Sequence, residues 1–452
     1  MTPGARAPDG GGTWVAGAEG TWVPGADGSG FGIEHLPYGV IRGAASEPRV
    51  AVRVGDRALD LAALHEAGLL AVPGLSAAVL SAPTLNRFLE LGRTVWSATR
   101  AGLIELLSAG ESGADRVGAL GERALVPLAE VEVMPPVAVG DYVDFYSSLE
   151  HATNLGRIFR PGGEPLLPNW RHLPVAYHGR AGSIVVSGTP VRRPLGQRPP
   201  QAPNGAPSFG PERQLDFELE LGFVTGAGPG AAVPAGGSGA AVPAGGAAVP
   251  AAAAAEHIFG VMLVNDWSAR EIQRWEAQPL GPFLGKSFAT SVAGWITPLE
   301  ALAAHRVPGA EQDPPPLPYL RTEEAWALDL ELEVAIVPAG SGAEVTVTRT
   351  NARELNWNMA QQLAHATSGG AVVRAGDLFA SGTISGPDPT SYGSLIELSW
   401  GGSRPLVLDG VERTFLEDGD TVVMRGVAPG GGGRALLELG EVRGTVLASS
   451  AG

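Results

Sequence analysis

The chain contains no cysteine, and Lys286 is its only lysine. The missing cysteine excludes disulfide bonds, thiolate nucleophiles and zinc sites with cysteine ligands. The remaining basic residues are arginines, which keep their charge, whereas burial can lower the pKa of a lysine. The single lysine therefore indicates either a position that arginine cannot fill or an accident of a composition that disfavours lysine.

The chain also lacks an excess of basic residues and a long apolar run. The net charge of −16 leaves no excess of basic residues, which argues against a nucleic-acid surface. No apolar run reaches the roughly 20 residues of a membrane helix, and no basic start is followed by an apolar stretch. We therefore expect a cytoplasmic protein that binds neither nucleic acid nor membrane. With 452 residues, 44% of them hydrophobic, it is long enough for two or three domains with a substantial core.

The N-terminal part carries no cluster of chemically active residues. Residues 1–20 are rich in Gly, Ala and Pro and are expected to form a disordered tail. Residues 21–136 contain a strand-like run at 50–54 and helical periodicity over 85–107, which predicts a small accessory domain. Residues 137–452 then form the domain expected to hold the site.

Within that second domain, residues 226–255 consist only of Gly, Ala, Pro, Val and Ser. Such a segment offers little apolar area to offset the entropy of ordering the chain, and its prolines break helices. The composition predicts an expanded surface loop without a packed element.

Residues 265–290, NDWSAREIQRWEAQPLGPFLGKSFAT, hold the densest group of polar side chains. A helix that begins near Trp267 would turn two of them to one face, because they are three residues apart. The Pro and Gly residues at 279–282 would end this helix and return the chain to the lysine. One short segment could thus bring together a carboxylate, a guanidinium, an amide and an ammonium, from Asp266, Arg270, Gln273 and Lys286.

Two segments, 215–223 and 328–334, alternate apolar and acidic residues as amphipathic strands do. In the first, Glu218 and Glu220 would lie about 7 Å apart on one face, close enough to bind one oxygen-preferring cation such as calcium. In the second, Asp329, Glu331 and Glu333 repeat the pattern. Periodicity alone does not distinguish a cation site from a solvated face in either segment.

Elsewhere, residues 144–151, DFYSSLEH, place an aspartate seven residues before His151, which is either structural or a base. Residues 351–367 have an N-cap candidate and helix-forming residues. In GDLFASGTISG a turn and a strand precede Thr383. Glu397 alternates with apolar neighbours, so it is expected to point away from them, either at the surface or toward a partner.

Several long motifs, in one order, resemble the fumarylacetoacetase family. They are DFYSSLEHATN (144–154), LLPNWRHLPVAYHGRAGSIVVSGTPVRRPLGQ (166–197), LDFELE (215–220), the NDWSAR to GKSF segment and GDLFASGTISGPDP (376–389). The resemblance implies a mainly β (α+β) fold, with an N-terminal SH3-like barrel domain and a C-terminal mixed β-roll domain. It also implies a homodimer that hydrolyses a carbon–carbon bond next to a 1,3-diketone.

The same resemblance implies a role for each matching residue. It assigns His151 as the base that activates water, with Glu397 as its partner, and a stabilising role for the developing negative charge to Arg270, Gln273 and Lys286. It assigns substrate contacts to Tyr146, Arg160, Tyr177, Gln273 and Thr383. It assigns a calcium ion to Asp144, Glu218, Glu220 and Asp266, and a second cation, magnesium, to Asp266, Lys286 and Thr290, with the lysine contributing its backbone oxygen.

One departure leaves the substrate open, because the family usually has tyrosine after WE and this chain has Ala277. Two alternatives follow. The chain could be a related hydrolase of acylpyruvates or other 3-oxo acids, or a non-catalytic homologue. The extended PNWRHLP and RRPLGQ motifs favour the fumarylacetoacetate hydrolase, and the presence of both a base and its orienting acid argues against a binding protein.

Overall fold

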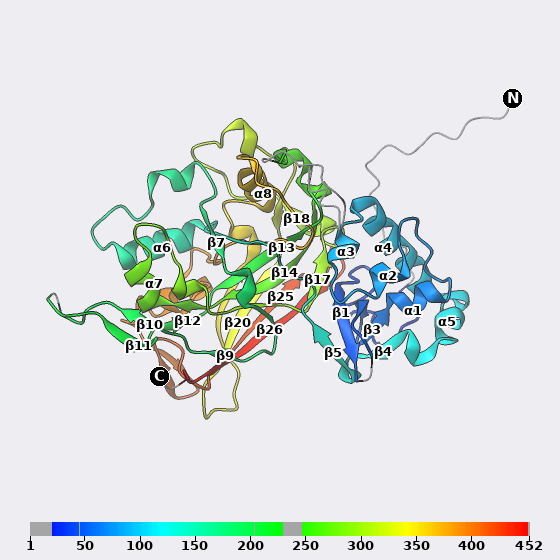
Figure 1. Ribbon diagram of the computed structural model, residues 1–452, viewed down its shortest axis with the longest axis horizontal. Helices are drawn as coiled ribbons and strands as arrows, with labels where there is room; N and C mark the ends of the chain where they lie inside the picture. Colours follow the sequence, from blue (N-terminus) through cyan, green and yellow to red (C-terminus); the bar gives the residue numbers. More distant parts are fainter. Residues whose placement is uncertain (1–19, 45, 203, 229–245, 451–452) are drawn as a thin grey trace, which may run out of the picture.

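The computed structural model of the chain describes residues 20–44, 46–202, 204–228 and 246–450. The predicted tail at 1–20, except for its last residue, and the middle of the 226–255 segment lie outside these ranges. Figure 1 shows two unequal parts side by side, a smaller N-terminal one and a larger C-terminal one. Within the described residues, no helix is both long and apolar enough to cross a membrane.

The N-terminal part is built on antiparallel strands, in which β1 pairs with both β2 and β5, and β3 pairs with β2 and β4. These strands are β1 (Tyr38–Gly43), β2 (Arg49–Val54), β3 (Arg57–Asp60), β4 (Leu125–Pro127) and β5 (Val131–Met134). Helices cover them: α1 (Leu61–Glu66), α2 (Ala77–Leu80), α3 (Asn86–Leu89), α4 (Arg93–Leu107) and α5 (Glu111–Gly118). The predicted strand at 50–54 is confirmed. The helical periodicity over 85–107 is divided between α3 and α4, because Gly92 has a φ of 78°.

The C-terminal part contains two facing sheets. The larger one continues from β1 through β17, β14, β13, β22 and β6 to β7, with β16 and β8 beside β14. Its strands are β6 (Tyr142–Phe145), β7 (Ala176–Gly179), β8 (Ile184–Val186), β13 (Leu219–Thr225), β14 (Ile258–Asp266), β16 (Thr290–Val292), β17 (Trp295–Pro298) and β22 (Leu378–Ala380). The five-stranded sheet runs β21-β20-β25-β26-β9, and its β25 and β26 contact β14. These strands are β9 (Val191–Arg192), β20 (Glu331–Val337), β21 (Val345–Asn351), β25 (Thr421–Ala428) and β26 (Leu437–Leu447).

Short hairpins and helices surround the sheets. The two-stranded pairs are β10 (Leu195–Arg198) with β11 (Ser208–Pro211), β12 (Leu215–Asp216) with β15 (Ser268–Ala269), β18 (Arg306–Val307) with β19 (Ala327–Leu328), and β23 (Leu406–Leu408) with β24 (Val411–Arg413). The helices are α6 (Leu149–Phe159), α7 (Arg270–Glu276), α8 (Met359–Thr367) and α9 (Leu395–Leu398). The β10–β11 hairpin projects from the molecule in Figure 1. The expected mainly β fold with two domains of the fumarylacetoacetase type is confirmed.

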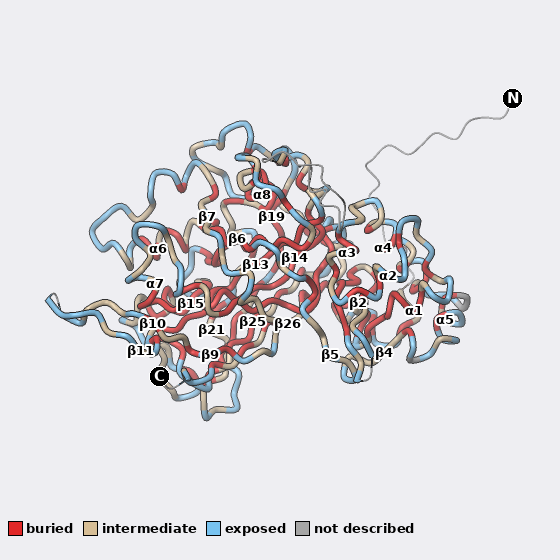
Figure 2. Tube along the Cα trace, in the orientation of Figure 1, coloured by how far each residue is buried: buried red, intermediate tan, exposed pale blue. Residues whose placement is uncertain are grey.

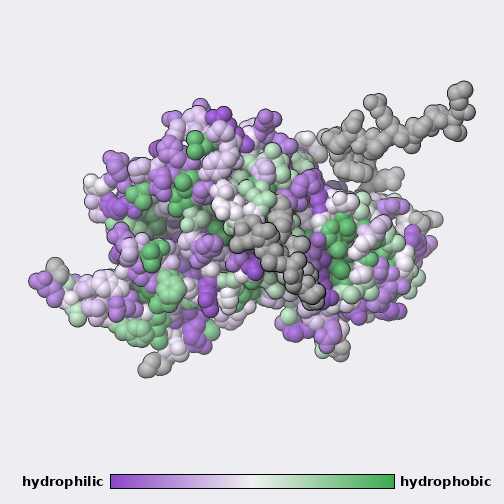
Figure 3. Space-filling view, turned by 45° about the horizontal axis from the view of Figure 1, so that its top comes forward, coloured by the Kyte–Doolittle hydropathy of each residue, from purple (hydrophilic) through white to green (hydrophobic). Residues whose placement is uncertain are grey.

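One hydrophobic core runs through both parts, and buried segments continue from one to the other in Figure 2. At the junction, β1 pairs with β17, and the rings of Tyr38, Phe88 and Trp96 pack around Phe259 of β14. The core shared by the two parts holds the large sheet, which carries the polar site, in a fixed place. On the face drawn in Figure 3, hydrophobic groups are small and separated by polar ones.

Two local expectations are wrong. The helix expected from Trp267 begins only at Arg270, because residues 268–269 pair as β15 with β12. The segment 226–255 does contain a packed element, since a 3-10 helix at Ala251–Glu256 buries Ala251 and Ala254 against the core. Of the two positions left open for Glu397, the surface is excluded, because this residue is buried on the one-turn helix α9.

Residues 351–367 form two elements where we expected one. Asn351 caps only a 3-10 turn, Ala352–Glu354. Asn358 then caps α8 through a reciprocal capping box with Gln361. The second cap satisfies the first-turn amides of the helix, so α8 begins after it.

Candidate active site

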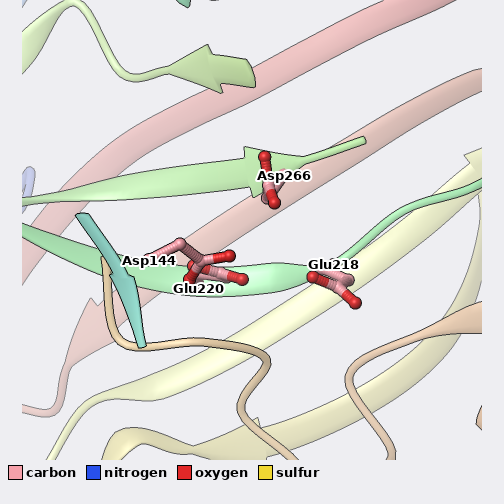
Figure 4. Close-up of side chains that lie close together, drawn as sticks. All are labelled: Asp144, Glu218, Glu220 and Asp266. Atoms are coloured by element: carbon pink, nitrogen blue, oxygen red, sulfur yellow. The ribbon is translucent and has the colours of Figure 1, made fainter. Parts of the chain in front are cut away.

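Four carboxylates meet inside the large sheet, as Figure 4 shows. Asp144 lies on β6, Glu220 on β13 and Asp266 at the end of β14, and all are buried. Glu218 joins them from the step between β12 and β13. One oxygen of each carboxylate lies within 4.8 Å of the others. The sequence prediction that these four side chains come together is thus matched by their placement.

The strand that carries the two glutamates is interrupted, and the interruption shapes the site. The alternation over 215–223 spans β12 and β13, with Phe217 and Glu218 between them. The amide of Glu218 donates to Oδ1 of Asn265 at 3.1 Å, and Glu218 also pairs with Ser394 in an isolated bridge. The step therefore ties Glu218 to both β14 and the segment that leads into α9.

The cluster has more negative charge than its protein partners neutralise. Burial, followed by the charge of Asp266, raises the pKa of Asp144 well above its usual value. Burial, followed by the charge of Asp144, does the same to Glu220. Oδ1 of Asp144 and Oε1 of Glu220 are buried without a hydrogen-bond partner. Orphaned carboxylate oxygens that converge in this way suit a hard cation with oxygen ligands, so the residues fit calcium or magnesium.

Lys286 is buried beside two of these carboxylates. Its Nζ pairs with Oε2 of Glu218 and lies 2.7 Å from Oδ2 of Asp266. Burial alone would lower the pKa of this lysine, but the charges of Asp266 and Glu218 outweigh burial and raise it. The lysine is therefore positively charged, and the net shift of its pKa is upward rather than the downward one that burial alone would cause.

Asp266 is held from three sides. Besides Lys286, it accepts hydrogen bonds from Oγ1 of Thr290 at 2.7 Å and from the hydroxyl of Tyr177 at 2.9 Å. The register Asp266↔Thr290 in the β14–β16 pair brings the threonine to it. The structure thus brings together the three residues predicted for a second cation, and it is the ammonium of the lysine that contacts the aspartate.

His151 and Glu397 form a buried pair. Nδ1 of His151 lies 2.6 Å from Oε2 of Glu397, and Nε2 lies 3.8 Å from Oε1 of Glu218. A carboxylate can only accept here, so Nδ1 donates to Glu397 and Nε2 is the ring nitrogen that faces Glu218. The ring of Tyr146 stands edge-on to the imidazole, with centroids 5.3 Å apart.

Three donors besides His151 hold Glu397: Asn154 at 3.0 Å, Ser385 at 3.0 Å and Ser394 at 2.6 Å. Burial would raise the pKa of this glutamate, but the charge of His151 and these hydrogen bonds lower it. Glu397 is therefore an ionised acceptor that fixes the imidazole. Asn154 follows His151 by three residues on α6, so helical spacing was a signal that could have found it.

Arg270, the first residue of α7, is completely buried. Its guanidinium lies 2.8 Å from Oε1 of Glu218 and 2.7 Å from Oδ2 of Asp216, and its NH1 group donates to Oε1 of Gln273 at 3.1 Å. The predicted pairing of Arg270 with Gln273 on one face of the helix is matched. Asp216, which the sequence reasoning did not select, is its second anionic partner.

The residues predicted to contact the substrate do not all lie in the same surroundings. Thr383 is buried, and its Oγ1 has no hydrogen-bond partner. It follows Gly382, whose amide donates to Oε2 of Glu220 at 3.2 Å and whose φ of 76° favours glycine. Tyr146 and Tyr177 touch the site as described above. Arg160 is exposed at the end of α6, where it donates to the carbonyl of Pro165 at 2.8 Å.

Comparisons with known proteins cover both parts of the chain. Residues 34–136 match the family model for the fumarylacetoacetase N-terminal domain, and residues 142–447 match the model for the fumarylacetoacetate (FAA) hydrolase C-terminal domain. The chain is 46% identical over 408 residues to the fumarylacetoacetase of Arabidopsis thaliana, which covers 89% of this chain and 93% of that one. It is 45% identical over 423 residues to that of Rattus norvegicus, covering 93% and 96%.

Among solved structures, a candidate HpcE protein of Mycobacterium smegmatis matches with a TM-score of 0.50 at 18% identity, over 91% of this chain and 99% of that one. This likeness concerns the fold alone. The sequence relatives and the two family models together cover nearly the whole chain. The chain belongs to the fumarylacetoacetase family.

Proposed function

We propose that this protein hydrolyses fumarylacetoacetate to fumarate and acetoacetate, the last step in the degradation of tyrosine and phenylalanine. The observation that carries the proposal is the position of the His151–Glu397 pair beside a buried cluster of four carboxylates. Such a cluster with a base at its edge suits a reaction in which an activated water attacks a polarised carbonyl. The curated relatives named fumarylacetoacetase support this choice of substrate.

Asp144, Glu218, Glu220 and Asp266 would hold a calcium ion, and Asp266, Lys286 and Thr290 a magnesium ion. A bound cation supplies Lewis-acid polarisation of the diketone oxygens. The two carboxylate oxygens without protein partners support the first assignment. Lys286 neutralises part of the acidic charge of Glu218 and Asp266. Burial would raise the pKa of Glu218, but the charges of Lys286 and Arg270 lower it.

His151 accepts a proton from water at Nε2, while Glu397 accepts the Nδ1 hydrogen bond and stabilises the imidazolium that forms. The water oxygen then forms a bond to the fumaryl carbonyl carbon, and the π pair of that carbonyl moves to its oxygen. As this oxyanion re-forms the carbonyl, the bond from the carbon to the acetoacetate carbon breaks, and its electron pair passes to the acetoacetate as an enolate. The enolate takes up the proton held by the His151 imidazolium, which restores the base.

Arg270, Gln273 and Lys286 are assigned to stabilise the negative charge that develops on the substrate oxygens. Fixed donors in a dry site act in this way without reorganisation. The burial of Arg270 and Lys286 supports this role. Tyr146, Arg160, Tyr177 and Thr383 are assigned to substrate contacts, and the unpartnered hydroxyl of Thr383 supports its place among them.

Two further parts of the proposal rest on the family resemblance, namely that the protein is a homodimer and that it acts in the cytoplasm. Light scattering of the purified protein measures the first, and fractionation of the source cells measures the second. A monomer at working concentration would contradict the first part without affecting the reaction.

The reaction is tested by giving purified protein fumarylacetoacetate and, in parallel, a simple acylpyruvate. Loss of the diketone absorbance is followed, and fumarate is identified as a product. We expect kcat/KM for fumarylacetoacetate to be at least about tenfold higher, which corresponds to about 1.4 kcal/mol of transition-state discrimination. The opposite preference would favour an acylpyruvate hydrolase, and no turnover of either would favour a non-catalytic homologue.

A further inference from the structure

One buried carboxylate next to the site belongs to neither the cation cluster nor the His151–Glu397 pair. Asp216, at the end of β12, is completely buried. Its register with Ser268 in the β12–β15 pair places it beside the residues that lead into α7. Both of its oxygens are bound by groups that carry other parts of the site.

The first of these groups is Arg270. Its Nε donates to Oδ2 of Asp216 at 2.7 Å, and its NH2 group lies 2.7 Å from the same oxygen. On its other side the guanidinium lies 2.8 Å from Glu218. A guanidinium is a planar fork, so an anion on each side fixes both its position and its plane. Asp216 is the one of these two anions that lies outside the four-carboxylate cluster.

The second group is the start of α9, the helix that carries Glu397. The amide of Leu395 donates to Oδ1 of Asp216 at 2.7 Å, and the amide of Ile396 donates to Oδ2 at 3.1 Å. An N-cap serine normally accepts such first-turn bonds through its own side chain. Ser394, the N-cap here, does not, and its hydroxyl donates to Glu397 at 2.6 Å instead. Asp216 therefore caps α9 from a distant segment and leaves Ser394 to hold Glu397.

We propose that Asp216 is a positioning residue that holds Arg270 and the Glu397–His151 pair in one common frame. Arg270 and α9 share no hydrogen bond or ion pair with each other among the described residues, and Asp216 binds both. The orientation of the charge-stabilising guanidinium and that of the base thus depend on the same carboxylate. This inference rests on the proposed function for its kinetic part, and its structural part stands independently.

The test replaces Asp216 and a matched control aspartate. Asp60 in the N-terminal part is also buried and also caps a helix, because it accepts from the amides of Ala62 at 2.9 Å and Ala63 at 3.0 Å. Both Asp216→Asn and Asp60→Asn should lower the melting temperature. We expect only Asp216→Asn to lower kcat, by about 10–100-fold, the usual cost of losing a partner that orients a reacting group. KM should change less than about threefold, and Asp60→Asn should keep kcat within about twofold.

Hydrogen exchange measured by mass spectrometry supplies a readout that does not depend on turnover. The peptide that covers 394–400 should exchange faster in Asp216→Asn and be unchanged in Asp60→Asn. If the unaltered protein does not turn over fumarylacetoacetate, the proposed function fails, and this exchange measurement alone decides the inference. Unchanged exchange in both variants, or kcat in Asp216→Asn within about twofold of the control, would overturn it.

Asp216→Asn leaves a buried guanidinium with one anion fewer, and the variant could fail to fold for that reason. Arg270→Gln alone and Arg270→Gln combined with Asp216→Asn then replace the pair of variants. The double variant should have faster exchange at 394–400 than the single one and a lower residual kcat. Equal exchange and equal kcat in the two would overturn the part of the inference that concerns α9.

Discussion

Two segments of this chain have the same pattern of acids and opposite surroundings. In 215–220 the acids are Asp216, Glu218 and Glu220, and in 328–333 they are Asp329, Glu331 and Glu333. The first three are all buried. In the second set Glu331 is exposed, Glu333 is half-buried, and Asp329 is buried but pairs with two partly exposed arginines. Alternation therefore tells which side chains share a face, but not what covers that face.

The difference comes from the sheet to which each segment belongs. The first segment continues into β13, which lies between β14 and β22 in the middle of the large sheet, and every residue of β13 is buried. The second continues into β20, whose apolar residues face the core while Glu333 pairs with arginines of β21 and β25. Among the described residues, the first segment therefore buries one acid without an ion pair, Glu220, beside two acids that pair with Arg270 and Lys286. The second leaves its acid without an ion pair, Glu331, exposed to solvent.

The largest effect is expected from removing cations. Their removal should act on the acids of the first segment and not on those of the second. Exhaustive chelation should reduce turnover to background, because four buried carboxylates then repel one another and no Lewis acid polarises the substrate. Calcium or magnesium should restore turnover. Metal content measured by mass spectrometry beside the activity assay checks this expectation, and full turnover by metal-free protein would contradict it.

The two buried histidines near the two segments give the next comparison. His151→Ala should lower kcat about 10²–10⁴-fold, the typical cost of losing a general base. His305 is also buried, and its carbonyl accepts from the amide of Asp329 at 2.9 Å in the second segment. His305→Ala should change the melting temperature but leave kcat within about twofold. Equal kcat in the two variants would remove His151 as the base.

Lys286→Arg asks whether the single lysine is chemical or accidental. An arginine fork cannot occupy the space of an ammonium that lies 2.7 Å from Asp266 without displacing its neighbours. We expect kcat to fall about 10²–10³-fold, as for other losses of a preorganised charge contact, with the melting temperature retained. Near-normal turnover would mean that composition alone explains why the chain has one lysine.

The corresponding glutamates of the two segments give the most direct comparison. Glu220→Gln should weaken calcium binding by at least about 10–100-fold. The loss of a residue that only hydrogen-bonds to a metal ligand already costs this much, and Glu220 is assigned as a ligand itself. Glu333 holds the corresponding position in the second segment, where it pairs with Arg349 at 2.5 Å. The substitution Glu333→Gln should therefore leave calcium binding unchanged. Calorimetric titration of both variants measures the effect. Equal loss in both would mean that the second segment also takes part in binding.

The smallest effect is expected from shortening the low-complexity segment. The amide of Gly228 donates to the carbonyl of Val373 at 3.0 Å, and that of Gly246 donates to the carbonyl of Gly370 at 2.7 Å, so both ends are anchored on one short stretch. Deleting residues 231–243 should therefore change melting temperature and kcat little, because closure entropy depends only logarithmically on loop length. Deleting residues 249–256 instead should destabilise the protein, since Val249 and Ala254 are buried. Equal effects of the two deletions would contradict the division of this segment into a dispensable part and a packed part.

The sequence by itself determined the family, the candidate residues of the site and a few strands. Alternation and spacing are local properties, so the acids of 215–220 and the Arg270–Gln273 pair could be predicted from neighbours in the chain. The family motifs added His151 and Glu397. They also correctly separated the first acidic segment from the second as the one near the other site residues, which periodicity could not do.

Only the tertiary structure decided how these residues are connected. That Glu397 sits on a buried helical turn, that Lys286 is a fixed charge and that Asp216 binds both Arg270 and α9 all depend on contacts between segments far apart in the chain. Burial and the charges that surround a group are set by what packs against it after folding. The pKa values and hydrogen bonds of a site therefore follow from the assembled sheets and not from local pattern.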